Sequence, residues 1–142
     1  EQAAWEIANE KGIQLTSLRP GPIYGSRDHK MTTSLLQKLD RSFLVVPRIR
    51  LPMVHAGDVA KAVIASIEND KSMGKPYNII GESVELPQLF SLLKQLTSSP
   101  CRLLPLPISL GREFDDSLAL EELGIVYRSL RAGWTEAIGG QS

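Results

Sequence analysis

Short segments with the periodicity of strands alternate along the chain with segments that have the periodicity of helices. Residues 13–18 alternate apolar and polar side chains, as a half-buried strand does, and residues 77–80 form a second, largely apolar strand. Helical patterns come before, between and after these strands, at residues 1–11, 58–67 and 86–96. Strands separated by helices pair most readily in parallel, so this order predicts an α/β fold with parallel strands in its first half.

The best-defined helix is predicted to open at Asp58, whose carboxylate can accept a hydrogen bond from a free N–H of the first turn. Its apolar residues recur at helical spacing and define the side expected to be buried: Val59, Ala60, Val63, Ile64 and Ile67. Asp115 and Ser129 are the expected caps of two later helices. Because the sequence has no repeat, low-complexity run or linker, residues 1–142 are predicted to form one compact unit.

Prolines and threonines predict the structure of the intervening segments. Thr32 or Thr33 is the expected cap of a short helix. Residues 42–53 are expected to form short extended pieces, because Pro47 and Pro52 interrupt them. This second segment therefore contributes no long strand to the predicted fold.

A Pro-Gly-Pro turn directly follows the first predicted strand. Prolines are poorly tolerated inside a central strand, so residues 20–28 are predicted to form a loop at the carboxyl edge of that strand. In open α/β sheets this is the edge at which ligands bind. A rigid connection between strand and helix, without any ligand, is the alternative interpretation.

The composition excludes several classes of function. Sixteen basic residues balance sixteen acidic ones, so no net field draws the chain to nucleic acid or to an anionic membrane. No apolar run approaches the roughly 20 residues that span a bilayer, and His29, His55 and the one cysteine, Cys101, do not form a set of metal ligands. We therefore expect a cytoplasmic protein without metal, nucleic-acid or membrane partners. Because a helical pattern starts at Glu1 without a preceding Met, we also expect residues upstream of this chain.

Four motifs, in this order, resemble those of the extended short-chain dehydrogenase/reductases, the NAD-dependent epimerase/dehydratase family. Residues 18–25 (LRPGPIYG) are similar to its L-R-P-x-x-V-Y-G loop, and residues 54–60 (VHAGDVA) are similar to its V-H-V-x-D-V-A segment. Residues 77–81 (YNIIG) and 115–124 (DDSLALEELG) resemble two later motifs, although Leu118 replaces a basic residue. The resemblance implies the C-terminal part of a Rossmann-type parallel sheet with a smaller substrate-capping region.

In that family a glycine-rich nucleotide loop and a Tyr-x-x-x-Lys pair precede these motifs, and neither is present in this chain. Tyr24, Tyr77 and Tyr127 are the only tyrosines, and none has Lys four positions later. The resemblance therefore implies no catalytic residue here and an inactive chain when it is alone. The intact protein is expected to be an NAD- or NADP-dependent enzyme that acts on a small secondary alcohol or ketone.

The resemblance also assigns a binding site. Pro20, Gly21, Pro22 and Ile23 are expected to bind the nicotinamide end of the cofactor, because Gly21 removes bulk and the prolines fix the backbone. The Ile23 N–H and the nearby carbonyls can then meet a planar carboxamide. Tyr24 is expected to contact substrate. Pro22 stands where many sugar-nucleotide enzymes carry Asn, which favours the dihydroflavonol-reductase and sterol-dehydrogenase types over the sugar-epimerase type.

Three further residues have alternative interpretations. Arg50 is a candidate phosphate ligand for a nucleotide-sugar substrate, but its register is off by one residue, so a solvated strand residue is the alternative. His55 is expected to pack and hydrogen-bond near the following helix, and Asp58 to cap that helix, rather than to act as bases. The resemblance leaves open a homodimer and, as the alternative function, a non-catalytic cofactor sensor or scaffold.

Overall fold

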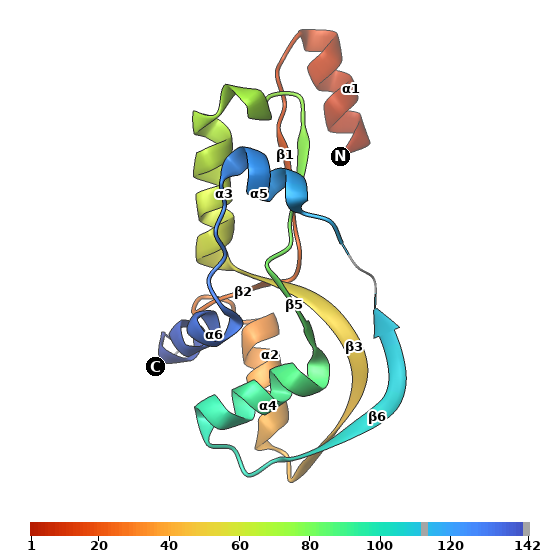
Figure 1. Ribbon diagram of the computed structural model, residues 1–142, viewed down its shortest axis with the longest axis vertical. Coiled ribbons are helices and arrows are strands. Elements are labelled where there is room, and N and C mark those ends of the chain that lie inside the picture. The colour runs from red at the N-terminus through yellow and green to blue at the C-terminus, as the bar shows by residue number, and fades with distance from the viewer. Residues whose placement is uncertain (112–113, 141–142) are drawn as a thin grey trace.

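The computed structural model describes residues 1–111 and 114–140, and it is elongated, with two groups of elements that several segments of the chain connect (Figure 1). The β1–β4 part consists of α1 (Gln2–Lys11), β1 (Ser17–Pro20), α3 (Ala56–Glu68), β4 (Pro76–Ile79) and α5 (Ser117–Leu123). The β3–β6 part consists of β2 (Ile23–Tyr24), α2 (Met31–Gln37), β5 (Glu82–Glu85), α4 (Leu86–Thr97), β6 (Arg102–Gly111) and α6 (Leu130–Gly139). The long strand β3 (Phe43–His55) runs from the β3–β6 part to the start of α3. Two 3₁₀ turns cover Lys38–Asp40 and Asp70–Ser72.

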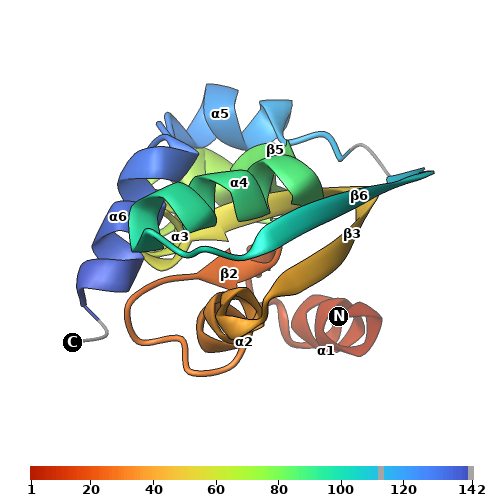
Figure 2. The same ribbon diagram turned by 90° about the horizontal axis from the view of Figure 1, so that it is seen from below.

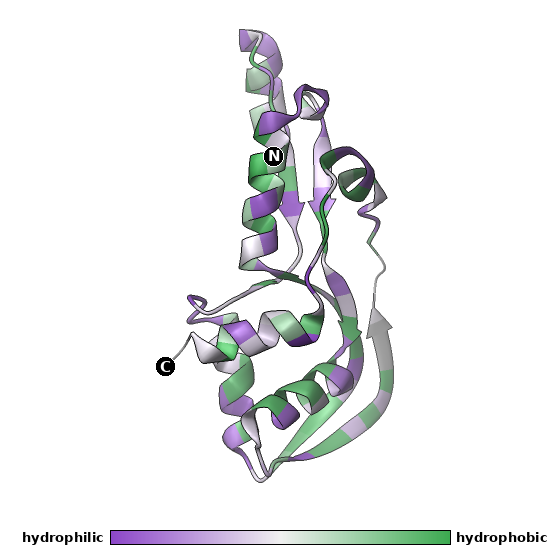
Figure 3. Ribbon diagram, turned by 60° about the vertical axis from the view of Figure 1, so that its left-hand side comes forward, coloured by the Kyte–Doolittle hydropathy of each residue, from purple (hydrophilic) through white to green (hydrophobic). Residues whose placement is uncertain are grey.

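The β1–β4 part contains a parallel strand pair flanked by helices. Its register runs from Ser17 opposite Pro76 to Pro20 opposite Ile79. Helix α3 contacts β1 and helix α5 contacts β4 (Figure 3). The buried side chains between them are Val54, Ala62, Tyr77, Ile79, Ala119, Leu123 and Ile125. The predicted α/β fold with parallel strands is therefore confirmed.

The first strand lies later in the chain than predicted and includes a proline. We expected residues 13–18 to be extended and the loop to start at Pro20, but β1 covers Ser17–Pro20. Pro20 is tolerated because the ladder takes its donor from Gly21, so the missing N–H of Pro20 lies on the side of β1 that faces away from β4. The Gly21 N–H then donates to the Ile79 carbonyl at 2.9 Å and continues the ladder beyond the proline.

The prediction of short, broken pieces over residues 42–53 is wrong, because β3 is one strand of 13 residues. It pairs in parallel with β6, antiparallel with β5 and, at Val54 and His55, in parallel with β2. The register with β6 shifts between Pro47 and Arg48, so the irregular ladder accommodates the first proline. Helices α2 and α4 contribute leucines to the core beneath this strand (Figure 2).

Two helices are capped by residues other than the predicted ones. The Asp28 carboxylate, not Thr32 or Thr33, accepts hydrogen bonds from the backbone N–H groups that open α2, including that of Thr32 at 2.7 Å. His55 is the N-cap of α3, because its Nδ1 accepts from the Gly57 N–H at 3.0 Å. Both cap predictions are therefore wrong by a few residues, because Asp28 and His55, which lie upstream of the predicted caps, accept from the first N–H groups of these helices.

The apolar side of α3 is exposed, although we predicted that it would be buried. The exposed fractions of Val63, Ile64 and Ile67 are 42%, 55% and 75%, whereas Ala62 is buried. Among the described residues, β1 has one strand partner, β4, so the sheet is too narrow to cover this helix. Ile7 of α1 is likewise 51% exposed. The β1–β4 part thus presents an uncovered apolar surface.

Candidate functional site

A pocket lies where the carboxyl ends of β1 and β4 meet β3. Its volume is about 340 Å³. The residues that line it are Arg19, Pro20, Gly21, Pro22, Pro52, Asn78, Ile80 and Phe114. Five of these eight carry apolar side chains, and two polar side chains, Arg19 and Asn78, stand among them. The sequence predicted the loop at this strand edge. The structure adds the opposite wall of the pocket, which Pro52, Ile80 and Phe114 form.

Two backbone hydrogen bonds fix the Pro-Gly-Pro loop. The Gly21 N–H donates to Ile79, and the Val54 N–H donates to the Pro22 carbonyl at 3.1 Å. Because Ile23 pairs with Val54 in a parallel ladder, the Ile23 amide points to the opposite edge of β2, and its side chain is 39% exposed. Of the four predicted cofactor-binding residues, Pro20, Gly21 and Pro22 therefore line the pocket, whereas Ile23 lies next to it.

Glycines allow the backbones to come close together behind the pocket. A Cβ added at Gly21 would lie 3.4 Å from the Pro52 carbonyl oxygen and 3.5 Å from that of Ile80. Gly81 has φ +71°, and a Cβ there would overlap the Met53 carbonyl oxygen. Strands β3 and β4 can cross here only because Gly81 has no side chain.

Polar groups at the rim of the pocket are held in ion pairs and hydrogen bonds. Arg19 Nη2 lies 2.7 Å from Glu1 Oε1, and hydrogen bonding to Arg19 lowers the pKa of the Glu1 carboxyl to about 2. The Asn78 side-chain amide donates to the Asp115 carbonyl at 2.8 Å. This last bond attaches the segment next to Phe114 to β4, so the rim is built from both halves of the sequence.

The two predicted substrate-binding residues lie outside this pocket. Tyr24 is 1% exposed, and its ring stacks on Trp134 with a centroid distance of 4.7 Å. Burial raises the pKa of Tyr24 to about 12. Arg50 is exposed on β3, opposite Glu85 of β5. In the described chain Tyr24 thus has a packing role, and Arg50 lies on β3 two residues before Pro52 without lining the pocket.

A buried charge cluster joins α3 to the segment before α6. Asp58 is 1% exposed, and its carboxylate accepts from the Arg128 backbone N–H at 3.0 Å and from Arg128 Nε at 3.2 Å. Burial opposes the ionisation of Asp58, but the hydrogen bonds from Arg128 outweigh it and lower the pKa of the carboxyl. Arg128 also pairs with Glu136 of α6. The sequence did not predict this cluster, because its partners are 70 residues apart.

His55 lies beside this cluster and next to the Tyr24 ring. Its side chain is 5% exposed, its Nε2 is 3.8 Å from Glu136 Oε1, and its ring meets Tyr24 edge-on at 5.3 Å. Burial lowers the pKa of His55, and the nearby Arg128 lowers it further. The imidazole therefore caps α3 and packs against the Tyr24 ring.

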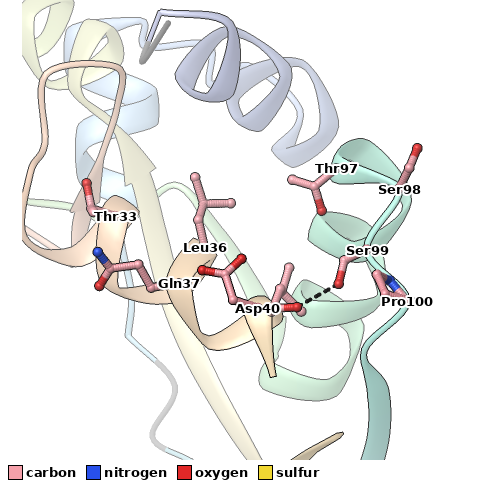
Figure 4. A pocket seen from close by; sticks show the side chains of 9 residues that line it. Thr33, Leu36, Gln37, Asp40, Thr97, Ser98, Ser99 and Pro100 are labelled. Carbon is pink, nitrogen blue, oxygen red and sulfur yellow. Dashed lines mark hydrogen bonds between the residues drawn. The ribbon is translucent and has the colours of Figure 1, made fainter. Parts of the chain in front are cut away.

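A larger cavity, of about 590 Å³, lies between the ends of α2 and α4 (Figure 4). Ser99 Oγ donates to the Leu39 carbonyl across it at 2.8 Å. Asp40 is the one ionisable residue among its lining residues. It lies beside the starts of β3 and β6, at the other end of β3 from the Pro-Gly-Pro loop, and none of its groups resembles a catalytic set, so the strand-edge pocket is the better candidate.

The part of the chain that the structure describes offers neither a metal site nor a membrane span. No three His, Cys, Asp or Glu side chains in residues 1–111 and 114–140 gather as metal ligands. None of the helices in these ranges has the length and apolarity that a bilayer crossing needs.

The sequence of residues 1–79 matches the model of the NAD-dependent epimerase/dehydratase family. This match covers more than half of the 142 residues. The chain belongs to that family. Its match includes the whole Pro-Gly-Pro loop, β3 and α3, and ends at the last residue of β4, so the candidate pocket is built largely from the matched region.

Solved structures of family enzymes have the same fold. UDP-glucose 4-epimerase from Thermotoga maritima, solved with UDP-glucose, is 21% identical, with a TM-score of 0.82 over 98% of this chain and 49% of that one. UDP-glucuronic acid 4-epimerase from Bacillus cereus, solved with UDP-glucuronic acid and NAD, is 19% identical, with a TM-score of 0.80 over 99% and 49%. An engineered reductase is 20% identical, with a TM-score of 0.77 over 99% and 48%. No curated protein sequence matches the chain.

The chain spans about half the length of these solved relatives. The Rossmann-type α/β fold predicted from the four motifs is therefore confirmed for the part of the fold that this chain covers. The cofactor of the family is NAD, and one relative was solved with NAD bound.

Proposed function

We propose that the chain is the C-terminal part of an NAD- or NADP-dependent oxidoreductase or epimerase that acts on a secondary alcohol or ketone. The observation that carries the proposal is the strand-edge pocket, which Pro20, Gly21 and Pro22 line together with Pro52, Ile80 and Phe114. Ligands of parallel α/β sheets bind at this edge. The Tyr-x-x-x-Lys pair and the nucleotide loop would come from residues that precede this chain.

The residues of the pocket fit one end of a dinucleotide. Pro20 and Pro22 offer flat apolar surfaces to a planar ring. Ile23 does not line the pocket, but its amide, which points away from β3, would donate to a carboxamide that extends past Pro22. Arg19 stands at the rim as a cation. When bound, nicotinamide supplies or accepts a hydride at the substrate carbon. The chain's own residues orient that ring and exclude water, whereas the proton of the substrate hydroxyl is handled by the upstream Tyr.

The uncovered apolar surface of the β1–β4 part supports a larger intact fold. Parallel sheets are normally covered by helices on both faces and contain more than two strands. Here β1 pairs with β4 alone among the described strands, and Val63, Ile64 and Ile67 are exposed on α3. Further strands added beside β1 would widen the sheet beneath α3. We therefore place the nucleotide-binding half of the protein on this surface.

The lining of the pocket favours a substrate without a phosphate group. Pro22 occupies the position where many sugar-nucleotide members carry Asn, and Pro52, Ile80 and Phe114 add apolar surface. Arg50, the candidate phosphate ligand, is not part of the lining. These features support a reductase or sterol-type dehydrogenase within the family more than a nucleotide-sugar epimerase.

The test is hydride transfer by a protein that carries this chain together with the preceding residues. Aliphatic and aromatic ketones, sterols and UDP-sugars are each supplied with NADH or NADPH, and nicotinamide absorbance is followed. We expect turnover with an apolar ketone or sterol and loss of turnover when the upstream Tyr is replaced by Phe. Tight NADH binding without turnover of any substrate would instead support a cofactor sensor, and binding of neither cofactor would overturn the proposal.

A further inference from the structure

Helix α6 packs directly on the residue that follows the cofactor loop. A Cβ added at Gly133 would overlap the Tyr24 hydroxyl oxygen and would lie 2.9 Å from Tyr24 Cζ and 3.1 Å from Cε2. The neighbouring Trp134 stacks on the same ring, with an interplanar angle of 10°. Gly133 and Trp134 are both buried. The missing side chain at 133 therefore sets how close α6 comes to β2.

A second glycine makes the same kind of approach two turns later. A Cβ added at Gly140, directly after α6, would overlap Ser26 Cβ and would lie 3.1 Å from Ser26 Oγ. Gly133 and Gly140 are seven residues apart, which places them on roughly the same side of a helix. Their two contacts bracket residues 24–26, the segment that leads out of the Pro20–Ile23 loop.

Helix α6 is also held from other directions, so it offers a fixed surface to β2. Glu136 pairs with Arg128, which is itself held by Asp58 of α3. The Leu130 N–H, at the start of α6, donates to Glu82 Oε2 at 2.8 Å. By contrast, β2 has only two residues, and its ladder with β3 has two residue pairs. The packing of Tyr24 against α6 therefore adds to a short ladder in holding β2.

We propose that Gly133 and Trp134 are positioning residues for the nicotinamide end of the cofactor, an inference that rests on the function proposed above. They clamp the Tyr24 ring, and Tyr24 follows Ile23 directly, so the clamp fixes the direction of the Ile23 amide and of the Pro20–Pro22 turn. A misplacement of about 1 Å at such a site can cost on the order of 100-fold in rate. The last helix of the chain therefore sets the geometry of a loop more than 100 residues earlier.

The test compares Gly133→Ala with Gly139→Ala in the same helix. A Cβ at Gly139 meets nothing within 4 Å, so this variant makes the same chemical change without the overlap. In a protein that carries this chain and the preceding residues, we expect Gly133→Ala to weaken NADH binding about tenfold relative to Gly139→Ala. Binding of ADP-ribose, which lacks nicotinamide, should stay within about twofold. Adding Tyr24→Phe to Gly133→Ala removes the worst overlap and should restore part of the NADH affinity.

Equal losses for NADH and ADP-ribose, or no loss for either, would overturn the positioning role. The amide NMR signals of Gly21 and Ile23 separate this inference from the proposed function. If the parent protein binds no nucleotide, yet these two signals shift in Gly133→Ala and not in Gly139→Ala, the clamp on the loop is supported and the nicotinamide site is overturned. If Gly133→Ala does not fold, Trp134→Phe takes its place, because it keeps an aromatic stack of smaller area and should shift the same signals.

Discussion

Asp58→Asn tests the buried ion pair that joins α3 to the segment before α6. The substitution preserves the shape of the side chain and one acceptor oxygen, but it removes the charge and turns an amide NH₂ toward the donors of Arg128. Removing one partner of a buried pair costs about 3–5 kcal/mol. Because Arg128 is 23% exposed and keeps Glu136 as a partner, we expect a loss at or just below the low end of this range, about 2–3 kcal/mol of unfolding free energy.

Lys61→Met is the matched control, because Lys61 Nζ lies 3.4 Å from the same carboxylate, but its side chain is 62% exposed. Exposed pairs contribute little, so this change should cost less than about 0.5 kcal/mol. Urea unfolding followed by circular dichroism measures both variants. Since the folded state lowers the pKa of Asp58, its contribution is present above about pH 4 and is lost as the pH falls through the folded pKa. Equal costs for the two variants would refute the reasoning that burial decides the strength of each pair.

Three further changes test other contacts. The folded state lowers the pKa of His55, so the unfolded chain takes up a proton first as the pH falls, and the unfolding free energy should decrease below about pH 6.5. His55→Asn can still cap α3 and should remove this pH dependence between pH 7 and pH 5, measured by urea unfolding. Tyr77→Phe removes the 2.5 Å hydrogen bond to Glu122 and should lower the unfolding free energy by about 1–2 kcal/mol in the same assay. Gly81→Ala should prevent folding, judged by circular dichroism, whereas Gly74→Ala, at φ +75° with open space around it, should cost only about 1 kcal/mol.

The alternation of strands and helices was predictable because its signals are local. The helical period and the stop at Gly12 placed α1 correctly, and Ser129 caps α6 as predicted, accepting from the Ala132 N–H at 3.4 Å. The long strand β3 was not predictable from local signals. A proline normally interrupts a regular strand, and the register shift in the ladder with β6 accommodates Pro47 within β3. The information that decided this point lies about 60 residues further along the chain.

The candidate site was predictable only in part. Two prolines and a glycine marked the loop, because each restricts or frees the backbone at its own position. The burial of Tyr24 could not be predicted from local sequence, because it depends on Trp134 of the last helix. For α3, the pattern correctly marked an apolar side, but periodicity does not say what covers that side, and Ile67 is exposed here.

Strand β3 makes backbone hydrogen bonds in both parts of the fold. Its 13 residues extend over about 40 Å along the strand, from the ladder with β6 to the hydrogen bond between the Val54 N–H and the Pro22 carbonyl. One continuous strand thus makes both the ladder with β6 and the hydrogen bond to the Pro-Gly-Pro turn. The two parts of the fold therefore share a single backbone segment, and the position of the turn depends on how β3 packs against its partners in the other part.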